Sequence, residues 1–301
     1  MALVECVPNF SEGRRKDIID ALVGAAASVA GVAVLDVHSD ADHNRTVITT
    51  AGEPDSVLEA AFAAIAEAAR LIDMDTQQGQ HPRIGAADVV PFVPLEGITL
   101  EGCAELARRL GERVGRELQI PVYLYEAAAT RPERRNLADV RRGEYEGLKV
   151  AILTDPERAP DYGPARMGKA GAVAIGARLP LIAYNVYLNT DDVEIAQKIA
   201  ASIRYSGGGL AHVKALGLLV NGRAQVSMNL TDYTRTPIPR VMEMIRSEAA
   251  RYGVVVQSAE LVGLIPQAAL IEAARWYLQL DAFEADQILE DRLRQKLGAS
   301  Q

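Results

Sequence analysis

His81 is the residue of this sequence best placed to transfer protons. It lies between Gln80 and Pro82, near the end of the polar segment 73–85 and just before an apolar stretch. A residue that precedes proline is restricted to extended backbone conformations, so the direction of the imidazole is reproducible. Imidazole titrates near neutral pH and is the commonest general acid and base in enzymes. The setting predicts a catalytic histidine, although a structural or merely exposed histidine fits the spacing equally well.

A glycine-rich stretch, GPARMGKA, occupies residues 163–170. It fits the phosphate-binding P-loop pattern except at its last position, where Ala170 replaces the Ser or Thr that would bind magnesium. Pro164 also lacks the backbone N–H that such a loop directs at phosphate. A nucleotide site is therefore disfavoured. A loop carrying Arg166 and Lys169 still suits an anionic ligand, and the alternative is a solvated linker.

A third cluster combines carboxylates and imidazoles, the side chains from which transition-metal sites are built. It runs from Asp36 through His38, Asp40 and Asp42 to His43. Adjacent Asp42 and His43 do not readily face one point, and polar turns between strands are commonly rich in Asp and Ser. We therefore expect a turn here and no metal site.

The composition limits the class of protein. The chain has 301 residues, 49% apolar and 24% charged, as in ordinary globular proteins. Its longest uncharged stretch, 21–35, is shorter than the roughly 20 residues that a bilayer requires. A net charge of −8 argues against nucleic acid or an anionic membrane as the main partner. Only two cysteines, Cys6 and Cys103, and no signal-peptide pattern predict a reducing cytoplasm.

Hydrophobic periodicity predicts alternating strands and helices in the first half, in the order βαββαβ followed by one more helix and strand. Strands are predicted at residues 3–7, 32–37, 45–50, 88–93 and 122–125, and helices at 14–30, 54–72 and 100–118. Thr99 is a plausible N-cap for the last of these helices. The βαββαβ order is that of ferredoxin-like folds, in which helices pack on one face of a sheet.

The second half has similar elements and no obvious sequence repeat of the first. Two short helical stretches, 135–142 and 145–148, lead to a linker rich in proline and glycine at 154–171. Beyond it we expect strands at 172–177, 181–188, 213–220, 225–229 and 254–257. Helices are expected at 193–204, 240–252 and 267–278, followed by a charged tail helix at 284–297. The predicted class is α/β, an α+β sandwich, with domains at 1–170 and 171–280 and a tail at 281–301.

Nine ordered stretches, reaching to about Arg275, resemble one known family, the glutamate formimidoyltransferases. They are LVECVPNFSEG from Leu3, NRTVITTAG from Asn44, HPRIGAADVVPFVP from His81, PVYLYE from Pro121, RRGEYEGL from Arg141, APDYGP from Ala159, GARLPLIAYNVYL from Gly176, AQVSMNLTDY from Ala224 and ELVGLIPQAAL from Glu260. The resemblance implies two ferredoxin-like subdomains with facing β-sheets, a folate crevice between them, and a homodimer.

The resemblance also implies site residues. The catalytic histidine of the family falls on His81. Its folate-binding stretch falls on Gly163, Pro164, Ala165, Arg166, Met167, Gly168, Lys169, Ala170 and Gly171, and it differs in its interior from the vertebrate form and is a residue shorter. Both substrates carry carboxylates, for which arginine is a bidentate partner. Arg45, Arg83 and Arg178 lie in the matching stretches and are candidates for this role.

The implied reaction transfers a formimino group from N-formimino-L-glutamate to N5 of tetrahydrofolate, the co-substrate, in histidine degradation and without a metal. Three alternatives stay open: formyl transfer between 5-formyltetrahydrofolate and glutamate, a non-catalytic folate-binding protein, and a nucleotide- or metal-dependent enzyme. Beyond Leu278 we expect only a short charged helix, whereas vertebrate relatives carry a fused cyclodeaminase. The expected end product is therefore 5-formiminotetrahydrofolate, left to a separate deaminase.

Overall fold

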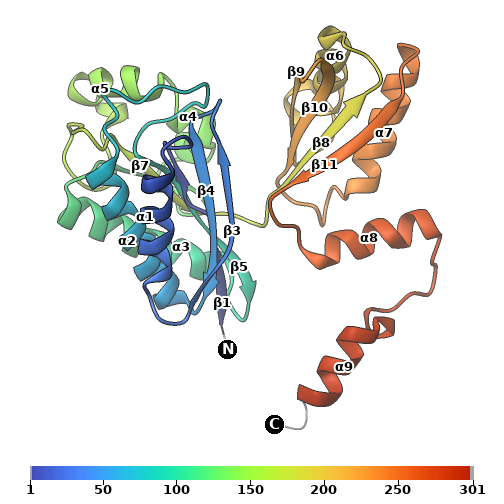
Figure 1. Cartoon of the computed structure of the whole chain (residues 1–301), viewed down its shortest axis with the longest axis horizontal. Coiled ribbons are helices and arrows are strands. Elements are labelled where there is room, and N and C mark those ends of the chain that lie inside the picture. The colour runs from blue at the N-terminus through green and yellow to red at the C-terminus, as the bar shows by residue number, and fades with distance from the viewer. Residues whose placement is uncertain (1, 299–301) are drawn as a thin grey trace. The chain divides into compact units, whose positions relative to one another are not determined.

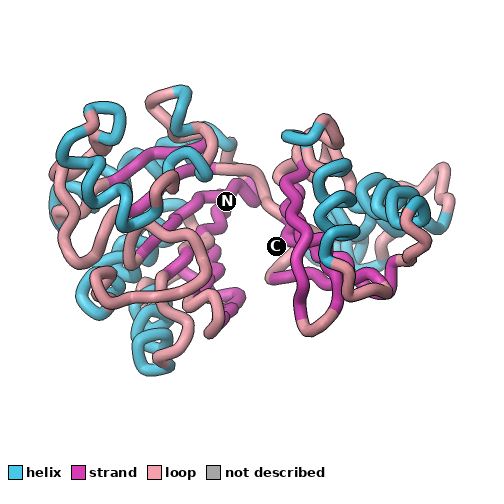
Figure 2. The backbone as a smooth tube through the Cα atoms, turned by 90° about the horizontal axis from the view of Figure 1, so that it is seen from above, coloured by secondary structure: helices cyan, strands magenta, loops and turns pink. Residues whose placement is uncertain are grey.

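The computed structural model describes residues 2–298 and divides into two compact units, one ending at Leu179 and the other starting at Pro180 (Figure 1). Each unit has its own sheet and its own hydrophobic core. Figure 2 shows the strands of each unit as one layer with helices packed against it.

The first unit is built on a mixed sheet. Strand β1 (Leu3–Cys6) continues as β2 (Asn9–Phe10), and both lie between β4 (Arg45–Gly52) and β5 (Ala87–Glu96), antiparallel to each. On the far side of β4 lies the edge strand β3 (Val32–Asp40). On the far side of β5 lie β7 (Val173–Ala177) and β6 (Val122–Glu126), all three parallel.

Helices cover both faces of part of this sheet. On one face lie α1 (Lys16–Ala27), α2 (Pro54–Leu71) and α3 (Leu100–Arg113), and Thr99 caps α3 by accepting a hydrogen bond from Gly102 N–H. A π-helical turn, Val114–Leu118, extends α3. The short helices α4 (Leu137–Val140) and α5 (Glu144–Thr154) pack on the opposite face, over alternate residues of β5, β6 and β7. Helix α5 of this second layer is joined to the His81 loop by the ion pair between Arg83 and Glu146.

The second unit repeats the same pattern on a smaller scale. Its elements are β8 (Ile182–Leu188), α6 (Val193–Ile203), β9 (Val213–Val220), β10 (Arg223–Leu230), α7 (Ile238–Arg251) and β11 (Val256–Val262). The strand order β11-β8-β10-β9 is equivalent to the order β5-β1-β4-β3 in the first unit. Two further helices follow, α8 (Gln267–Leu278) and α9 (Leu289–Gly298). Both units are thus ferredoxin-like, and the predicted α+β class is confirmed.

One strand belongs to a different sheet from the one expected. Residues 172–177 were assigned to the second half because they follow the segment rich in proline and glycine. In the structure this strand, β7, pairs in parallel with β5 and β6 of the first sheet. Parallel pairing joins segments distant in sequence, so local periodicity cannot assign such a strand to a sheet. The Pro- and Gly-rich segment is therefore a connection within the first unit.

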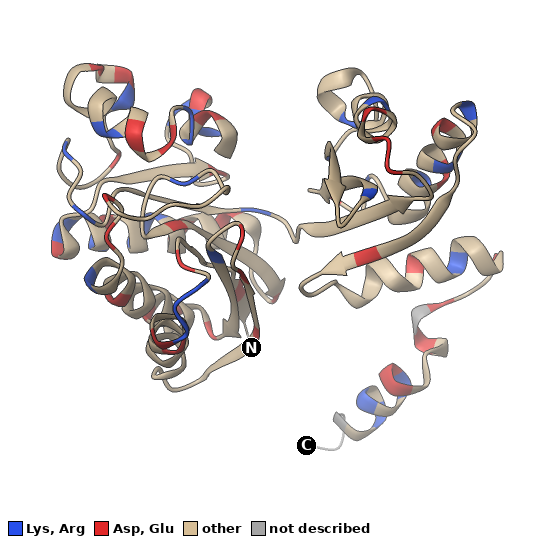
Figure 3. Cartoon of the chain, turned by 45° about the horizontal axis from the view of Figure 1, so that its top comes forward, with Lys and Arg blue, Asp and Glu red and all other residues tan. Residues whose placement is uncertain are grey.

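The distribution of charges, the two cysteines and the helix lengths bear on the surface of the protein and on the compartment predicted for it. Basic and acidic residues are interspersed along both units (Figure 3). Cys6 and Cys103 are buried free thiols in the first core. Every helix within residues 2–298 is too short or too polar to cross a bilayer.

Candidate functional site

His81 lies in the loop between α2 and β5, and its ring contacts a guanidinium group. Arg45, the first residue of β4, places its NH1 nitrogen 2.9 Å from His81 Nε2. Arginine is always a donor, so Nε2 must accept and the proton of the neutral ring must be on Nδ1. An imidazolium has no free lone pair and could not accept this bond. The contact therefore holds His81 in one tautomer and in its neutral form.

Asn44 is one of the residues that fix the loop carrying His81. Its side chain accepts from Gly13 N–H at 2.8 Å and donates to the Gln78 carbonyl at 2.8 Å. Asn44 has a φ of +50°, in the left-handed region that Asn tolerates better than most residues. A Cβ on Gly79 would lie 2.4 Å from the His43 carbonyl oxygen. The residue before Arg45 thus joins the start of β4 to the His81 loop.

Arg83 has a buried, fully engaged guanidinium. It donates from Nε to Gln77 Oε1 at 2.8 Å and from NH2 to the Gln77 carbonyl at 3.1 Å. It also forms an ion pair with Glu146 of α5 at 2.8 Å, and its side chain is only 9% exposed. These bonds tie the His81 loop to α5. The Arg83 charge is therefore used within the protein.

Asp88 holds a second arginine near the histidine. Its carboxylate is buried, accepts a hydrogen bond from Ile84 N–H at 2.8 Å and forms an ion pair with Arg141, which follows α4. Asp88 and Ile84 flank the start of β5, so the carboxylate orders the turn after Arg83. Arg141 is 17% exposed and contributes positive charge near His81.

This environment lowers the pKa of His81. Burial disfavours the charged ring, and the neighbouring charges of Arg45, Arg141 and His43 add repulsion, so the pKa falls from 6.5 to about 3. Asp40 opposes the shift and does not outweigh it. His81 is therefore unprotonated at neutral pH, as a general base must be. A ring with so low a pKa is nevertheless a weak base, so taking a proton is the difficult step for it.

A small depression surrounds this group. It is lined by apolar, polar and charged side chains from β2, β4, β5 and the His81 loop, namely Phe10, Ser11, His43, Asn44, Arg45, Gln77, His81, Arg83 and Asp88. The side chains of Arg45 and His81 are thus in contact at its wall. Within the described residues, this depression combines an imidazole of lowered pKa, His81, with the guanidinium groups of Arg45 and Arg83.

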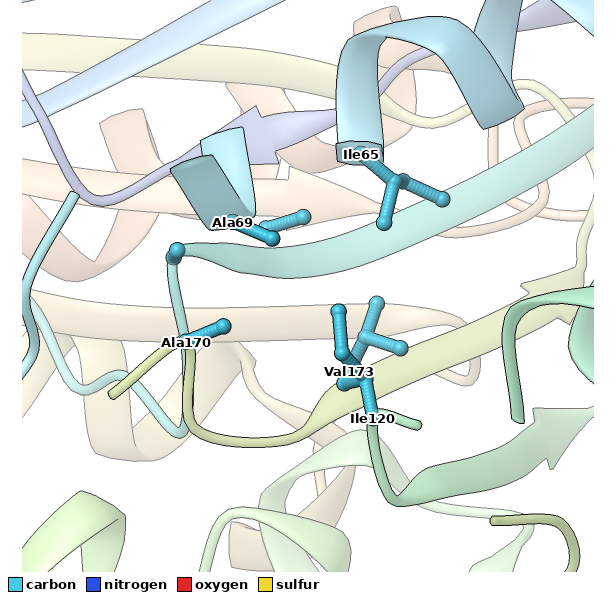
Figure 4. Close-up of a pocket in the computed structure, with 7 residues that line it drawn as sticks. Ile65, Ala69, Ile120, Ala170 and Val173 are labelled. Atoms are coloured by element: carbon cyan, nitrogen blue, oxygen red, sulfur yellow. The ribbon is translucent and has the colours of Figure 1, made fainter. Parts of the chain in front are cut away.

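The glycine-rich loop 163–171 lies against the segment that carries His81. The Gly171 and Gly85 backbones pair as an isolated bridge, and Ala170 accepts a hydrogen bond from Ala86 N–H at 2.8 Å. Ala170 lines a small apolar pocket with Ile65, Ala69, Ile120 and Val173 (Figure 4). A serine hydroxyl would be poorly placed in this apolar setting. Strand β7, and not a helix, follows the loop, so the P-loop architecture is absent from it.

The two cations of this loop differ in their partners. Lys169 forms an ion pair with Asp73 at 2.8 Å, and its carbonyl accepts from Met74 N–H at 2.8 Å, which ties the loop to the start of the His81 segment. Arg166 is exposed and has no ion pair among the residues that the structure describes. The loop thus presents exposed positive charge beside an anchored C-terminal end.

Arg178 lies elsewhere on the sheet. It follows β7, whereas Gly171 precedes it, so the two residues are about 20 Å apart at about 3.3 Å per residue. Its backbone N–H donates to the Phe92 carbonyl at 3.0 Å, at the same end of the neighbouring strand. Of the three arginines that sequence proposed as carboxylate contacts, the structure brings only Arg45 into contact with His81.

Only the end of the cluster from Asp36 to His43 is a turn: Asp36, His38 and Asp40 belong to β3, and residues 41–44 form the turn. Asp40 accepts hydrogen bonds from the backbone N–H groups of Asp42 and His43, both at 2.9 Å, and its second oxygen lies 2.7 Å from His43 Nδ1. The expected turn is thus confirmed for residues 41–44. Within residues 2–298, no three His, Cys, Asp or Glu side chains gather closely enough to hold a metal ion.

Three polar residues at the site escaped the sequence analysis: Asn44, Asp88 and Arg141. All three lie inside stretches that match the family, beginning at Asn44, His81 and Arg141. Composition and spacing give no signal for them, because their roles depend on contacts between β4, β5 and the α4–α5 connection. Their presence in the matching stretches is the signal that could have singled them out.

Two family descriptions match the chain. "Formiminotransferase domain, N-terminal subdomain" covers residues 3–178, and "Formiminotransferase domain" covers residues 183–297. The boundary between them falls beside the division between the two compact units at Leu179 and Pro180.

Several curated proteins resemble the chain over most of its length. A glutamate formimidoyltransferase of Thermoplasma acidophilum is 53% identical, with 97% of this chain and 98% of that protein aligned. One of Streptococcus pyogenes is 49% identical over the same shares. The formimidoyltransferase-cyclodeaminase of Gallus gallus is 43% identical, with 99% of this chain aligned to 56% of that longer protein.

Proposed function

The chain belongs to the formiminotransferase family, and from this premise we propose that it is a glutamate formimidoyltransferase. It would transfer the formimino group, HN=CH–, from N-formimino-L-glutamate to N5 of tetrahydrofolate, giving 5-formiminotetrahydrofolate and L-glutamate. The observation that carries the proposal is His81, a neutral imidazole in a depression lined by guanidinium groups, within a chain that matches both halves of the family.

The reaction requires one proton to move twice. As N5 of tetrahydrofolate bonds to the amidine carbon, His81 takes the N5 proton. The same proton is then given to the nitrogen of the departing glutamate as its bond to that carbon breaks. A single positioned imidazole serves both steps, which typically contributes about 10²- to 10⁴-fold in rate. Holding both amines beside one carbon adds the advantage of an intramolecular reaction.

Tetrahydrofolate is placed in this proposal at residues 163–171. The contact of Gly171 with Gly85 and the ion pair between Lys169 and Asp73 support a loop held beside the His81 segment. Arg166 and Lys169 supply charge for folate carboxylates. Arg83 is better explained as an anchor of the His81 loop, because Glu146 and Gln77 already occupy its guanidinium. Arg178 would reach only a distant part of an extended ligand.

The proposal also covers the oligomeric state of the protein, its compartment and its need for a metal. We propose a cytoplasmic homodimer that acts in histidine degradation and one-carbon metabolism without a metal. The oligomeric state is measurable by light scattering coupled to gel filtration. The need for a metal is measurable as activity before and after dialysis against a chelator.

The direct test is to incubate the purified chain with formiminoglutamate and tetrahydrofolate and to identify the folate product by mass spectrometry. Enzyme-dependent 5-formiminotetrahydrofolate is the expected result. Transfer only between 5-formyltetrahydrofolate and glutamate would identify a formyltransferase. Folate binding without any transfer would identify a binding protein, and either result would contradict the proposal.

A further inference from the structure

Two arginines beside His81 each have a buried nitrogen without a hydrogen-bond partner. The Nε–H groups of Arg45 and Arg141 are buried and have no hydrogen-bond acceptor among the residues that the structure describes. A buried donor without an acceptor is destabilising, because it has lost its hydrogen bond to water and gained none in the protein. Protein interiors rarely leave such groups without an acceptor, and functional sites are a common exception. The two arginines therefore mark a place where an acceptor is expected.

The charges around His81 are also unbalanced. Arg141 has a carboxylate partner, Asp88, which also binds Ile84 N–H. Arg45 has no ion pair within residues 2–298, and its hydrogen-bond partner is the neutral ring of His81. Burial and the repulsion of Arg141 both lower the pKa of Arg45. Arg141 is bound directly to Asp88, whereas Arg45 is attracted to Asp40 and Asp88 without an ion pair to either, so a further anion would be stabilised between the two guanidinium groups.

The hydrogen bond between Arg45 and His81 also conflicts with catalysis. The Nε2 lone pair that would accept a proton is occupied by Arg45 NH1 at 2.9 Å. Arginine prefers a carboxylate to a neutral imidazole, because charge-assisted bonds are about twice as strong as neutral ones. A carboxylate arriving at Arg45 would therefore draw the guanidinium away from Nε2.

We propose that Arg45 and Arg141 form the receptor for a carboxylate of the amino-acid substrate, and that this carboxylate, by taking Arg45 from His81 Nε2, frees the base only when the formimino donor is bound. The inference rests on the proposed function and adds to it a substrate contact, Arg141, and a control of the base by its own substrate. No covalent bond changes in this step. One hydrogen bond, from Arg45 to His81, is exchanged for charge-assisted bonds from Arg45 to the carboxylate.

The exchange also makes His81 a stronger base for the first half of the proton shuttle. Arg83 and Asp88 line the same depression as His81. The four groups that act most strongly on the charge of His81 are Arg45 from β4, Arg141 from the α4–α5 connection, Asp40 at the end of β3 and His43 from the turn that follows. Three of these four disfavour the imidazolium, and burial does so as well. A bound carboxylate adds a negative charge next to the ring and neutralises Arg45, so the pKa of His81 rises towards neutrality. The ring can then both take a proton and return it.

The test follows the His81 ring in the full chain by NMR, with isotope-labelled histidine. The chain has four histidines, and comparison with His81→Gln assigns the signal. Without ligand we expect a neutral ring protonated at Nδ1 that does not titrate above pH 5. Saturating L-glutamate should change the Nε2 resonance and raise the pKa of His81 by at least one unit. No change in either quantity would overturn the proposal.

A second titration distinguishes the two carboxylate sources. p-Aminobenzoylglutamate carries the carboxylates of the folate tail without the pterin. We expect it to leave the His81 signal unchanged. If it, and not L-glutamate, frees Nε2, the receptor serves folate and the proposal is overturned.

Kinetics provide an independent readout. Arg45→Gln and Arg141→Gln should each raise the KM for formiminoglutamate at least tenfold and change the KM for tetrahydrofolate less than twofold. Arg113→Gln is the control, because its guanidinium is partly buried and paired with Glu59, away from His81. Equal changes in both KM values, or none, would overturn the receptor. If the wild-type chain transfers no formimino group, the proposed function fails instead, and the NMR result still decides whether glutamate frees Nε2.

Discussion

Gly171 lies against Gly85 so closely that a Cβ on Gly171 would be 2.6 Å from the Gly85 Cα and 2.5 Å from the Ile84 carbonyl oxygen. Gly171 ends the candidate folate loop, and Gly85 follows His81 by four residues. The contact means that the loop and the His81 segment are held as one piece of structure. Gly171 also has a φ of +73°, a backbone conformation that residues other than glycine rarely adopt.

Gly171→Ala is therefore expected to destabilise the first unit and to raise the KM for tetrahydrofolate. The left-handed backbone alone costs about 1–2 kcal/mol for alanine, and the backbone contact adds to it. Gly31→Ala is the matched control, since Gly31 has a φ of +81° but an ordinary 3.5 Å contact to Ser56 Oγ. Unfolding in urea and steady-state kinetics measure both effects. Equal destabilisation by the two variants would show that the contact with Gly85 is unimportant.

Much of the fold could be predicted from the sequence because its signals are local. Helix α8 has the predicted bounds, Gln267–Leu278, and Thr99 caps α3 as expected. Strand β7 could not be placed in its sheet, because residues 173–177 pair with β5 and β6 far away in sequence. The same limit applies to the site. His81 has a local signature in the following proline, whereas the bond from Arg45 to His81 and the burial of Arg83 depend on how β4, β5 and α5 pack.

Arg83 is expected to contribute to stability more than to substrate binding. Arg83→Met removes the ion pair with Glu146 and leaves the Gln77 carbonyl and Oε1 without their donor, which should cost about 2 kcal/mol or more. Arg70→Met removes an exposed ion pair with Glu67 and should cost less than about 1 kcal/mol. Urea unfolding compares the two. Amide exchange at residues 77–81 should accelerate only in Arg83→Met, and unaltered exchange there would argue against the anchoring role.

The positive charges of the loop should act on folate. Arg166→Gln combined with Lys169→Gln removes two exposed cations beside the His81 segment, and we expect the KM for tetrahydrofolate to rise about tenfold, the loss of roughly 1.4 kcal/mol of binding. Lys198→Gln, which removes an exposed lysine paired with Glu194 on α6, is the control. The KM for formiminoglutamate should stay within twofold in both. A similar increase in the control would mean that overall charge matters and the loop does not.

His81 should make the protein sensitive to acid. Its pKa is about 3 in the folded state and 6.5 when unperturbed, so between these values the unfolded chain binds a proton that the folded chain does not. Stability is then lost as the pH falls from 6.5 towards 3, by at most about 1.4 kcal/mol per pH unit. His81→Gln, which keeps an acceptor for Arg45, should lose less stability over this range. Unfolding free energies of the two proteins at pH 7.0, 6.0 and 5.0 decide this, and parallel curves would exclude the lowered pKa.

Replacing His81 should reduce turnover far more than it reduces folate binding. His81→Gln retains a carbonyl acceptor for Arg45 and so preserves the surroundings, but an amide cannot carry a proton between two amines. We expect kcat to fall about 10²- to 10⁴-fold, while the affinity for tetrahydrofolate changes little because the candidate folate loop is untouched. His81→Ala should fall as far and should recover part of its activity when imidazole is added, since a free base can then act in the space left by the ring. The binding of tetrahydrofolate measured by calorimetry separates loss of catalysis from loss of substrate. A His81→Gln variant with nearly wild-type kcat would remove His81 from the chemistry, and a variant that no longer binds folate would make the histidine a binding residue instead of a base.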